Sequence, residues 1–359
     1  MIKYLGSKRR LVPVLGEMLS ASGASTALDL FTGTTRVAQE FKERGARVTA
    51  VDAARYSEVF ARCYIATDAR SVDVHELDRR LARLNALPGE PGYVTETFCL
   101  ASRFFRPENG ERIDAVRQAI RDDYGDDPVL LTSLIEAADR VDSTTGVQMA
   151  YLKQWAPRAR NPLELRQPEL LDGGGAVRRG DAVQLAAGLG SFDLAYLDPP
   201  YNQHRYFTNY HVWETLVAWD SPEAYGIAQK RTDARDESTK SAFNKRREMP
   251  DALRRCVEQI DARLLVLSYN DESWIALQEL IDMCACRGTV EVLTFDSKRY
   301  VGAQIGIHDH TGRRVGKISH LRNTEYVLVC GAAGDVARAT GSLRSAHPAR
   351  RAEESPLRA

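Results

Sequence analysis

The chain has 359 residues, enough for one large α/β domain with an insertion or for two domains. Lysine plus arginine equals aspartate plus glutamate, at 49 each, so any surface for nucleic acid must be a local patch. No apolar run reaches the length of a membrane span and the N-terminus carries no signal-peptide pattern, so we expect a soluble, cytoplasmic protein without a membrane partner.

The first pattern in the chain is residues 3–8 with the stretch that follows. Ser7 is a residue type that favours the start of a helix, and apolar side chains recur after it at helical spacing. We therefore predict a helix from Ser7 to about Leu19. Gly6 would allow close approach to the backbone, and Lys8 could bind a carboxylate. The alternative is a capped N-terminal helix with no further role.

A strand, a loop, a helix and a second strand follow, over Thr26–Phe31, Thr32–Thr35, Arg36–Arg44 and Val48–Val51. Asp52 ends the second strand, 23 positions after Asp29. This is close to the spacing of about 20 positions found where a carboxylate binds ribose hydroxyls. Many nucleotide-binding proteins share such a unit, so by itself it indicates a class of ligand and no reaction.

The segment from Thr67 to Gly175 carries no clear strand pattern. Its helical patterns cover Val74–Leu84, Ile113–Tyr124, Val129–Val141 and Val147–Trp155. Stretches rich in glycine and proline punctuate the block. We interpret this all-helical segment within an α/β pattern as an inserted subdomain.

The core pattern resumes at Gly180-Asp181, and Phe192–Leu197 is typical of a buried parallel strand. This strand ends at Asp198-Pro199-Pro200-Tyr201. Proline cannot donate to a sheet ladder, and its ring fixes the backbone. Asp198 is therefore presented at the carboxyl end of a core strand, where open α/β sheets bind their ligands.

This arrangement suits methylation of an exocyclic amine. Such an amine is a poor nucleophile while its lone pair is conjugated into the base. Asp198 and the carbonyl of Pro199 can each accept one N–H bond from it, which frees the lone pair, and Tyr201 can stack on an unstacked base. The alternative is a strand followed by an ordinary turn at Pro199 and Pro200.

Further elements follow the motif. We predict helices at His211–Trp219, Asp251–Asp261 and Ser273–Arg287, and strands at Leu264–Tyr269, Val290–Phe295 and Glu325–Cys330. Two basic loops, 229–247 and 298–322, are expected to contact phosphates; the alternative is a solvated surface.

The six cysteines form no paired CxxC motif, and His308-Asp309-His310 is interpreted as a solvated turn. We therefore expect no bound metal.

Together with Asn209-Tyr210-His211 and Glu214-Thr215, the tetrapeptide Asp198–Tyr201 resembles the catalytic motif of the DNA adenine methylase family. The resemblance implies an α/β fold: a Rossmann-like, doubly wound, mostly parallel seven-stranded sheet with an inserted helical subdomain. Residues 1–66 and 176–331 would form the catalytic core, and 67–175 the helical insertion used for target recognition. Within that insertion Trp155, Arg158 and Arg160 would read bases. Residues 332–359 are expected to form a disordered tail.

The same resemblance assigns the site residues. S-adenosylmethionine would be bound by residues that match the family's cofactor motifs and by the acidic residue of the second strand: Tyr4, Lys8, Asp29, Phe31, Gly33, Asp52, Asp181 and Asp198. Catalysis would rest on Asp198, Pro199, Pro200 and Tyr201. The family usually carries a second glycine where Thr35 stands, and a β-branched residue there narrows the room for the cofactor.

The implied function is a site-specific DNA methyltransferase that acts on N6 of a flipped-out adenine, with S-adenosylmethionine as methyl donor and no metal. DNA is the expected partner, and a cognate restriction enzyme a further one. N4 of cytosine is an alternative target because that amine is chemically alike. A non-catalytic DNA-binding partner of a modification system is a second alternative, favoured only by Thr35.

Overall fold

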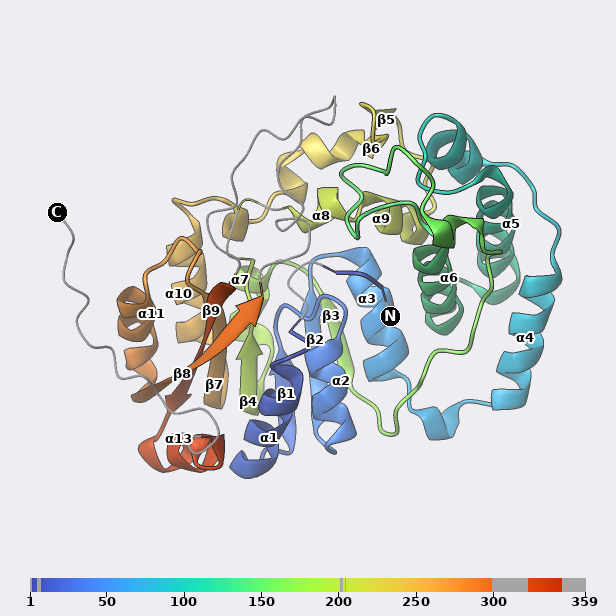
Figure 1. Ribbon diagram of the computed structural model, residues 1–359. Helices are drawn as coiled ribbons and strands as arrows, with labels where there is room; N and C mark the ends of the chain where they lie inside the picture. Colours follow the sequence, from blue (N-terminus) through green and yellow to red (C-terminus); the bar gives the residue numbers. More distant parts are fainter. Residues whose placement is uncertain (1, 5–7, 201–202, 204, 299–321, 344–359) are drawn as a thin grey trace. The chain divides into compact units, whose positions relative to one another are not determined.

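The computed structural model describes residues 2–4, 8–200, 203, 205–298 and 322–343. The chain forms two compact units. One consists of Met1–Arg9, Thr32–Ala182 and His204–Ser241, and the other of Arg10–Phe31, Val183–Gln203 and Ala242–Ala359. Seven strands make one sheet in the order β3-β2-β1-β4-β7-β9-β8 (Figure 1). The predicted mostly parallel, seven-stranded α/β fold is confirmed.

The second unit carries five strands of this sheet: β1 (Thr26–Asp29), β4 (Ser191–Leu197), β7 (Asp261–Asn270), β8 (Thr289–Lys298) and β9 (Arg322–Gly331). The neighbours β1, β4 and β7 are parallel, whereas β9 runs antiparallel to both β7 and β8. The runs Leu194–Leu197 and Leu264–Tyr269 are buried throughout, as is usual where helices cover both faces of a parallel sheet.

The helices of this unit are α1 (Val12–Ser22), α7 (Ala182–Leu185, which begins at the unit boundary), α10 (Met249–Gln259), α11 (Leu277–Cys284) and α13 (Ala333–Thr340). Short 3-10 turns cover Ala186–Gly188, Ala242–Asn244 and Ala285–Arg287. The expectation of a disordered tail is wrong for its first part, because α13 packs on α1 and buries its own Val336, Ala339 and Thr340. Residues 344–359 lie outside the described residues.

The first unit carries two parallel strands, β2 (Arg47–Asp52) and β3 (Ala176–Arg179), and the hairpin β5 (Ala224–Tyr225) with β6 (Lys230–Arg231). Its helices are α2 (Arg36–Glu43), α3 (Arg55–Ala61), α4 (Val74–Ala86), α5 (Pro107–Tyr124), α6 (Pro128–Val141), α8 (Tyr206–Asn209) and α9 (His211–Ala218). Segments with π-helical hydrogen bonds cover Arg62–Ala66 and Thr95–Leu100, and 3-10 turns cover Ala69–Ser71, Pro157–Arg160, Thr232–Arg235 and Glu237–Thr239.

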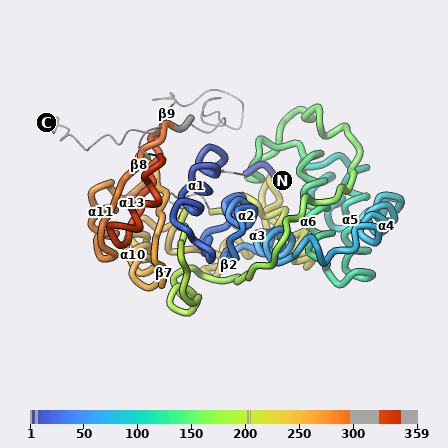
Figure 2. The backbone as a smooth tube through the Cα atoms, turned by 90° about the horizontal axis from the view of Figure 1, so that it is seen from below, coloured from blue at the N-terminus to red at the C-terminus, as the bar shows by residue number. Residues whose placement is uncertain are grey.

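The inserted subdomain is helical, as predicted: among residues 67–175, all of them described, no strand occurs. Figures 1 and 2 show α4, α5 and α6 side by side. The predicted helix Val147–Trp155 is wrong, because its backbone groups bond outside any helix: the N–H of Gln148 donates to Asn209 O and that of Leu152 to Ser143 O. The compact units follow other boundaries than the predicted core and insertion, since the insertion clusters with residues 32–66 and 204–241.

The described part of the chain contains no helix of the length and apolar character needed to cross a membrane.

Candidate active site

Asp198 follows directly on the last residue of β4, in the second unit. Its carboxylate is half-buried, and Oδ1 accepts a hydrogen bond of 3.0 Å from the hydroxyl of Ser268. The Ser268 oxygen lies 2.8 Å from the hydroxyl of Tyr196, so Tyr196 donates to Ser268 while Ser268 donates to Asp198. Both hydroxyl residues are buried in the sheet. This relay fixes the orientation of the Asp198 carboxylate at the strand end.

Sheet register explains how Ser268 comes to that position. Leu197 pairs with Leu267 in the parallel ladder between β4 and β7, so the next residue of each strand, Asp198 and Ser268, follows at the same level. On the other side of β4, Asp29 pairs with Tyr196. Asp29 is buried at the last position of β1, so the carboxyl ends of β1 and β4 bring Asp29 and Asp198 to one edge of the sheet.

The remaining predicted residues of this unit lie close to these strand ends. Phe31 follows β1 and meets Phe243 edge-on, with 4.9 Å between ring centroids. Pro199 is buried and Pro200 is partly exposed after β4. Tyr201, the predicted stacking residue, lies outside the described residues.

In the first unit, Asp52 ends β2 and binds the glycine loop. Its Oδ2 accepts the N–H of Gly33 at 2.8 Å, and its Oδ1 accepts the N–H of Ala54 at 2.9 Å. Burial raises the pKa of Asp52 above its ordinary value, and these N–H groups counteract part of that rise. The carboxylate thus joins the loop before α2 to the start of α3.

Gly33 lies against the ring of Tyr4. Its φ is +51°, and a Cβ there would stand 3.0 Å from Cε1 of Tyr4, so no larger residue fits without displacing the ring. Tyr4 also stacks on Tyr210 and Tyr206, at centroid distances of 4.8 and 5.3 Å. Lys8, the other predicted residue of this motif, is buried.

Thr35 has a left-handed backbone, with φ 64° and ψ 13°, immediately before α2. A β-branched residue is strained in this conformation, whereas glycine adopts it freely, which explains why a glycine is usual here. The Thr35 hydroxyl donates to Thr34 O and accepts from Nε2 of Gln39, both at 2.7 Å. The buried threonine is therefore held by its own hydrogen bonds.

Asp181 stands two residues beyond Arg179, the register partner of Asp52, and the N–H of Gly180 donates to Asp52 O at 3.0 Å. Asp52 and Asp181 therefore lie near the paired ends of β2 and β3, and the role of Asp181 in cofactor binding stays a prediction. No group of three or more His, Cys, Asp or Glu residues placed to hold a metal ion occurs within the described ranges.

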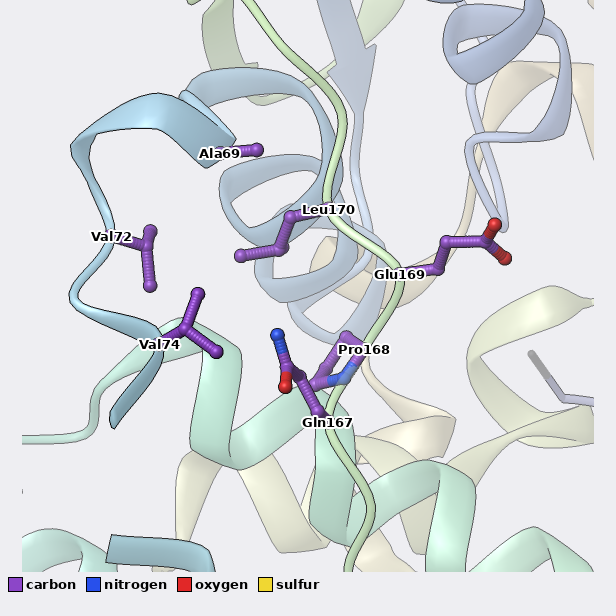
Figure 3. Close-up of a pocket in the computed structure, with 7 residues that line it drawn as sticks. All are labelled: Ala69, Val72, Val74, Gln167, Pro168, Glu169 and Leu170. Atoms are coloured by element: carbon purple, nitrogen blue, oxygen red, sulfur yellow. The ribbon is translucent and has the colours of Figure 1, made fainter. Parts of the chain in front are cut away.

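A surface pocket lies elsewhere in the first unit. It is lined by Ala69, Val72, Val74, Gln167, Pro168, Glu169 and Leu170. Figure 3 shows that these residues come from the start of the insertion and from the segment that precedes β3, and that the side chain of Glu169 points away from the others. None of the predicted site residues lines this pocket, so it carries no part of the predicted site.

Comparison with known proteins decides the family. Residues 4–283 match the model of the D12 class N6 adenine-specific DNA methyltransferases. This chain belongs to that family. It is 30% identical over 339 residues to the type II methyltransferase M.NlaIII of Neisseria lactamica, covering 89% of this chain and 98% of that protein.

Two further relatives are also type II methyltransferases by name. The type II methyltransferase M.CviAII of Paramecium bursaria Chlorella virus 1 is 28% identical, over 83% of this chain and 92% of that protein. The type II methyltransferase M.FokI of Planomicrobium okeanokoites is 27% identical over 81% of this chain. The matched region covers 48% of that longer protein. The chain is thus a DNA (adenine-N6)-methyltransferase, as the sequence predicted, and the family implies S-adenosylmethionine as methyl donor and DNA as substrate.

The D12-class methyltransferase uses two of its predicted DNA-binding arginines in ion pairs within the fold. Arg231 of the first basic loop makes bidentate ion pairs with Asp220 and Asp233, at distances from 2.7 to 3.0 Å. Arg158 of the insertion binds Oδ1 of buried Asp142 at 2.6 and 2.9 Å. These two guanidinium groups are structural.

Other predicted DNA-binding residues remain accessible. Arg246 and Arg247 are exposed, and so is Arg160, whereas Lys245 pairs with Glu248 at 3.1 Å. Trp155 is partly exposed beneath the guanidinium of Arg103, 4.8 Å from the ring centroid. Of the second basic loop, residues 299–321 lie outside the described residues.

Proposed function

We propose that this methyltransferase modifies N6 of an adenine that has left the duplex, and that Asp198 holds the reacting amine. The observation that carries the proposal is the relay from Tyr196 through Ser268 to Asp198. A carboxylate oriented by buried hydroxyls at a strand end is preorganised to accept an N–H bond. Positioning of this kind raises the rate because the geometry is set before the substrate arrives.

The chain's own groups would then act as follows. Asp198 accepts one N6 hydrogen bond and the carbonyl of Pro199 accepts the other, so the nitrogen lone pair leaves conjugation with the ring. Tyr201 stacks on the extruded base, which compensates part of the lost stacking in the duplex. S-adenosylmethionine supplies the electrophilic methyl group, and the chain needs no metal for this reaction.

The residues of the cofactor motifs suit that cofactor. The contact between Gly33 and Tyr4 leaves no space for a side chain, so loop backbone and an aromatic face lie together where a nucleoside could be bound. We assign Asp52 to the ribose hydroxyls, Lys8 to the methionine carboxylate and Asp181 to the adenine end, with Asp29 and Phe31 completing the set.

Asp52→Ala is expected to lower the affinity for S-adenosylmethionine about ten- to a hundredfold, because a hydrogen bond to a charged group contributes about 1.5–3 kcal/mol. Calorimetric titration of the cofactor measures this. The matched control is Asp73→Ala, since Asp73 also accepts a backbone N–H at a helix start but lies in the insertion. Equal cofactor affinity in Asp52→Ala and the parent chain would refute the assignment.

The exposed part of the first basic loop is expected to bind phosphates without reading sequence. Changing Lys245, Arg246 and Arg247 together to alanine should weaken binding to target and scrambled DNA alike. The slope of log K against log salt should flatten by up to about 0.9 per lost contact. Arg79, Arg80 and Arg83 changed together on α4 serve as the control. An unchanged salt slope in the loop mutant would make this loop an ordinary solvated surface.

Nucleoside analysis of modified DNA tests the function as a whole. DNA incubated with the chain and S-adenosylmethionine is digested to nucleosides, and N6-methyladenine is the expected product. N4-methylcytosine, or no modified base, would overturn the proposal. Sequencing of the methylated positions then gives the target sequence.

We further propose a restriction enzyme of the same specificity as partner, because the similar relatives M.NlaIII and M.CviAII are type II methyltransferases.

A further inference from the structure

The loop that joins α6 to Arg160 is buried although it has almost no regular structure. Between Asp142 and Ala156 no helix or strand occurs, and a single 3-10 turn follows at Pro157–Arg160. Seven of its residues are nevertheless buried: Asp142, Ser143, Thr144, Gly146, Gln148, Ala156 and Ala159. A buried loop must satisfy its backbone groups through specific partners, so the identity of those partners indicates what the loop holds in place.

The last turn of α6 and the first residue of the loop together hold the N-terminal segment. The Lys3 ammonium donates to Asp139 O at 2.5 Å and to Asp139 Oδ2 at 2.9 Å, and lies 3.3 Å from Oδ1 of Asp142. The backbone N–H of Lys3 also donates to Asp139 Oδ2, at 3.2 Å. Asp142 Oδ1 also forms an ion pair with the guanidinium of Arg158, at 2.6 Å. Two buried carboxylates therefore fix the residue that directly precedes Tyr4.

The middle of the loop holds the segment that carries Tyr210. The backbone N–H of Gln148 donates to Asn209 O at 2.8 Å. The side-chain Oε1 of Gln148 accepts the N–H of Val212 at 2.9 Å. Its carbonyl accepts from Nε2 of His211 at 3.0 Å. Gln148 is itself buried, so one side chain and its peptide groups bind three residues around Tyr210.

These two attachments flank a cluster of stacked tyrosines, Tyr4, Tyr206 and Tyr210. Tyr4 and Tyr210 stack with 4.8 Å between centroids and 16° between ring planes, and Tyr4 is the ring that lies against Gly33. The opposite side of the loop faces solvent at Met149, 42% exposed, and at Lys153 and Gln154. The loop thus presents polar and apolar groups outwards while it holds both partners of the tyrosine stack.

We propose that loop 142–160 is the joint through which binding of target DNA strengthens cofactor binding, with Lys3 and Gln148 as positioning residues for the Tyr4–Tyr210 pair. The inference rests on the proposed function, because it takes the cofactor to lie against Tyr4 and the insertion to touch DNA. DNA that orders the exposed face of the loop would also restrain its attachments. The protein would then lose less conformational freedom when the cofactor binds, which is positive coupling.

The experiment measures that coupling. S-adenosylhomocysteine, which permits no turnover, is titrated into the full chain by calorimetry. One titration uses the chain without DNA, and the other adds a duplex that contains the sequence which the enzyme methylates. The ratio of the two affinities is the coupling factor, and it is expected to be at least about fivefold for the parent chain. A scrambled duplex should give a smaller factor, since Trp155 and Arg160 of the loop are expected to read bases.

Lys3→Met and Gln148→Ala should each bring the coupling factor below about twofold, with S-adenosylhomocysteine affinity in the absence of DNA changed less than about threefold. Lys3→Arg should restore it, because it keeps the charge between Asp139 and Asp142. Arg83→Met is the matched control, since it removes an ion pair with Asp123 elsewhere in the insertion and should leave the factor unchanged.

The inference is overturned if the parent chain shows no coupling, if both joint variants retain it, or if Arg83→Met loses it equally. Melting curves confirm that each variant is folded at the assay temperature. Failure of the proposed function is distinguishable, because the parent chain would then produce no N6-methyladenine, whatever its coupling factor.

Discussion

Asp198→Ala is expected to lower the rate of methyl transfer to DNA by about a thousandfold or more while the fold is retained, because oriented groups that act on the transition state commonly contribute that much. Asp198→Asn should be severely impaired as well, since an amide accepts a hydrogen bond more weakly and can present its N–H₂ group to the amine. Transfer of a labelled methyl group to DNA at saturating cofactor measures both effects. Near-parental activity in Asp198→Ala would exclude the proposed mechanism.

The same strand provides a matched control. Asp193 lies near the opposite end of β4, where its Oδ2 accepts the N–H and hydroxyl groups of Ser25 and Thr26. Asp193→Asn removes a carboxylate from this strand without touching the relay, so the folded enzyme should keep its rate. Ser268→Ala should lower kcat about tenfold with little change in KM, since it only releases the orientation of Asp198.

The sheet was predictable from the sequence because its central strands are short apolar runs bounded by turn residues. The strand pattern at Phe192–Leu197 matches β4, and that at Leu264–Tyr269 lies within β7. The segment Val147–Trp155 misled the prediction, since its apolar spacing is helical although its backbone is bound by Ser143 and Asn209. Such long-range partners override local propensity and leave no trace in a local pattern.

The site was predictable only in part, for a similar reason. Asp198, Asp52 and Gly33 stand in recognisable motifs at strand ends and loops. Ser268 belongs to no motif. A lone serine near the end of an apolar strand, at the level of Asp198, could still have been found from the sheet register. The role of Gln148 depends on contacts with Asn209 and Val212, which only the folded chain brings together.

Glu214, which belongs to the sequence pattern of the family, is a buried carboxyl group on α9. Its Oε1 accepts the N–H of Arg55 at 2.8 Å, and its Oε2 lies 3.9 Å from Nε of that residue. Burial raises the pKa of Glu214 to about 7, although the neighbouring Arg55 opposes the shift. The unfolded chain releases this proton near pH 4.3. Between those two values the folded chain holds a proton that the unfolded chain has lost, so the contribution of Glu214 to stability falls as pH rises.

Glu214→Gln should therefore make the protein more stable at pH 8, by up to about 3 kcal/mol, and should change stability little near pH 4.5. The amide keeps an acceptor for the Arg55 N–H and cannot ionise. Urea unfolding of mutant and parent at pH 5, 6, 7 and 8 measures the difference, which should grow with pH and level off above about pH 7. Asp139, whose pKa burial raises to about 6, and His211, whose pKa burial lowers to about 3, are present in both proteins and cancel from it. Glu58→Gln on the neighbouring helix α3 is the control. A stability difference that stays constant across this range would mean that Glu214 is ionised in the folded enzyme.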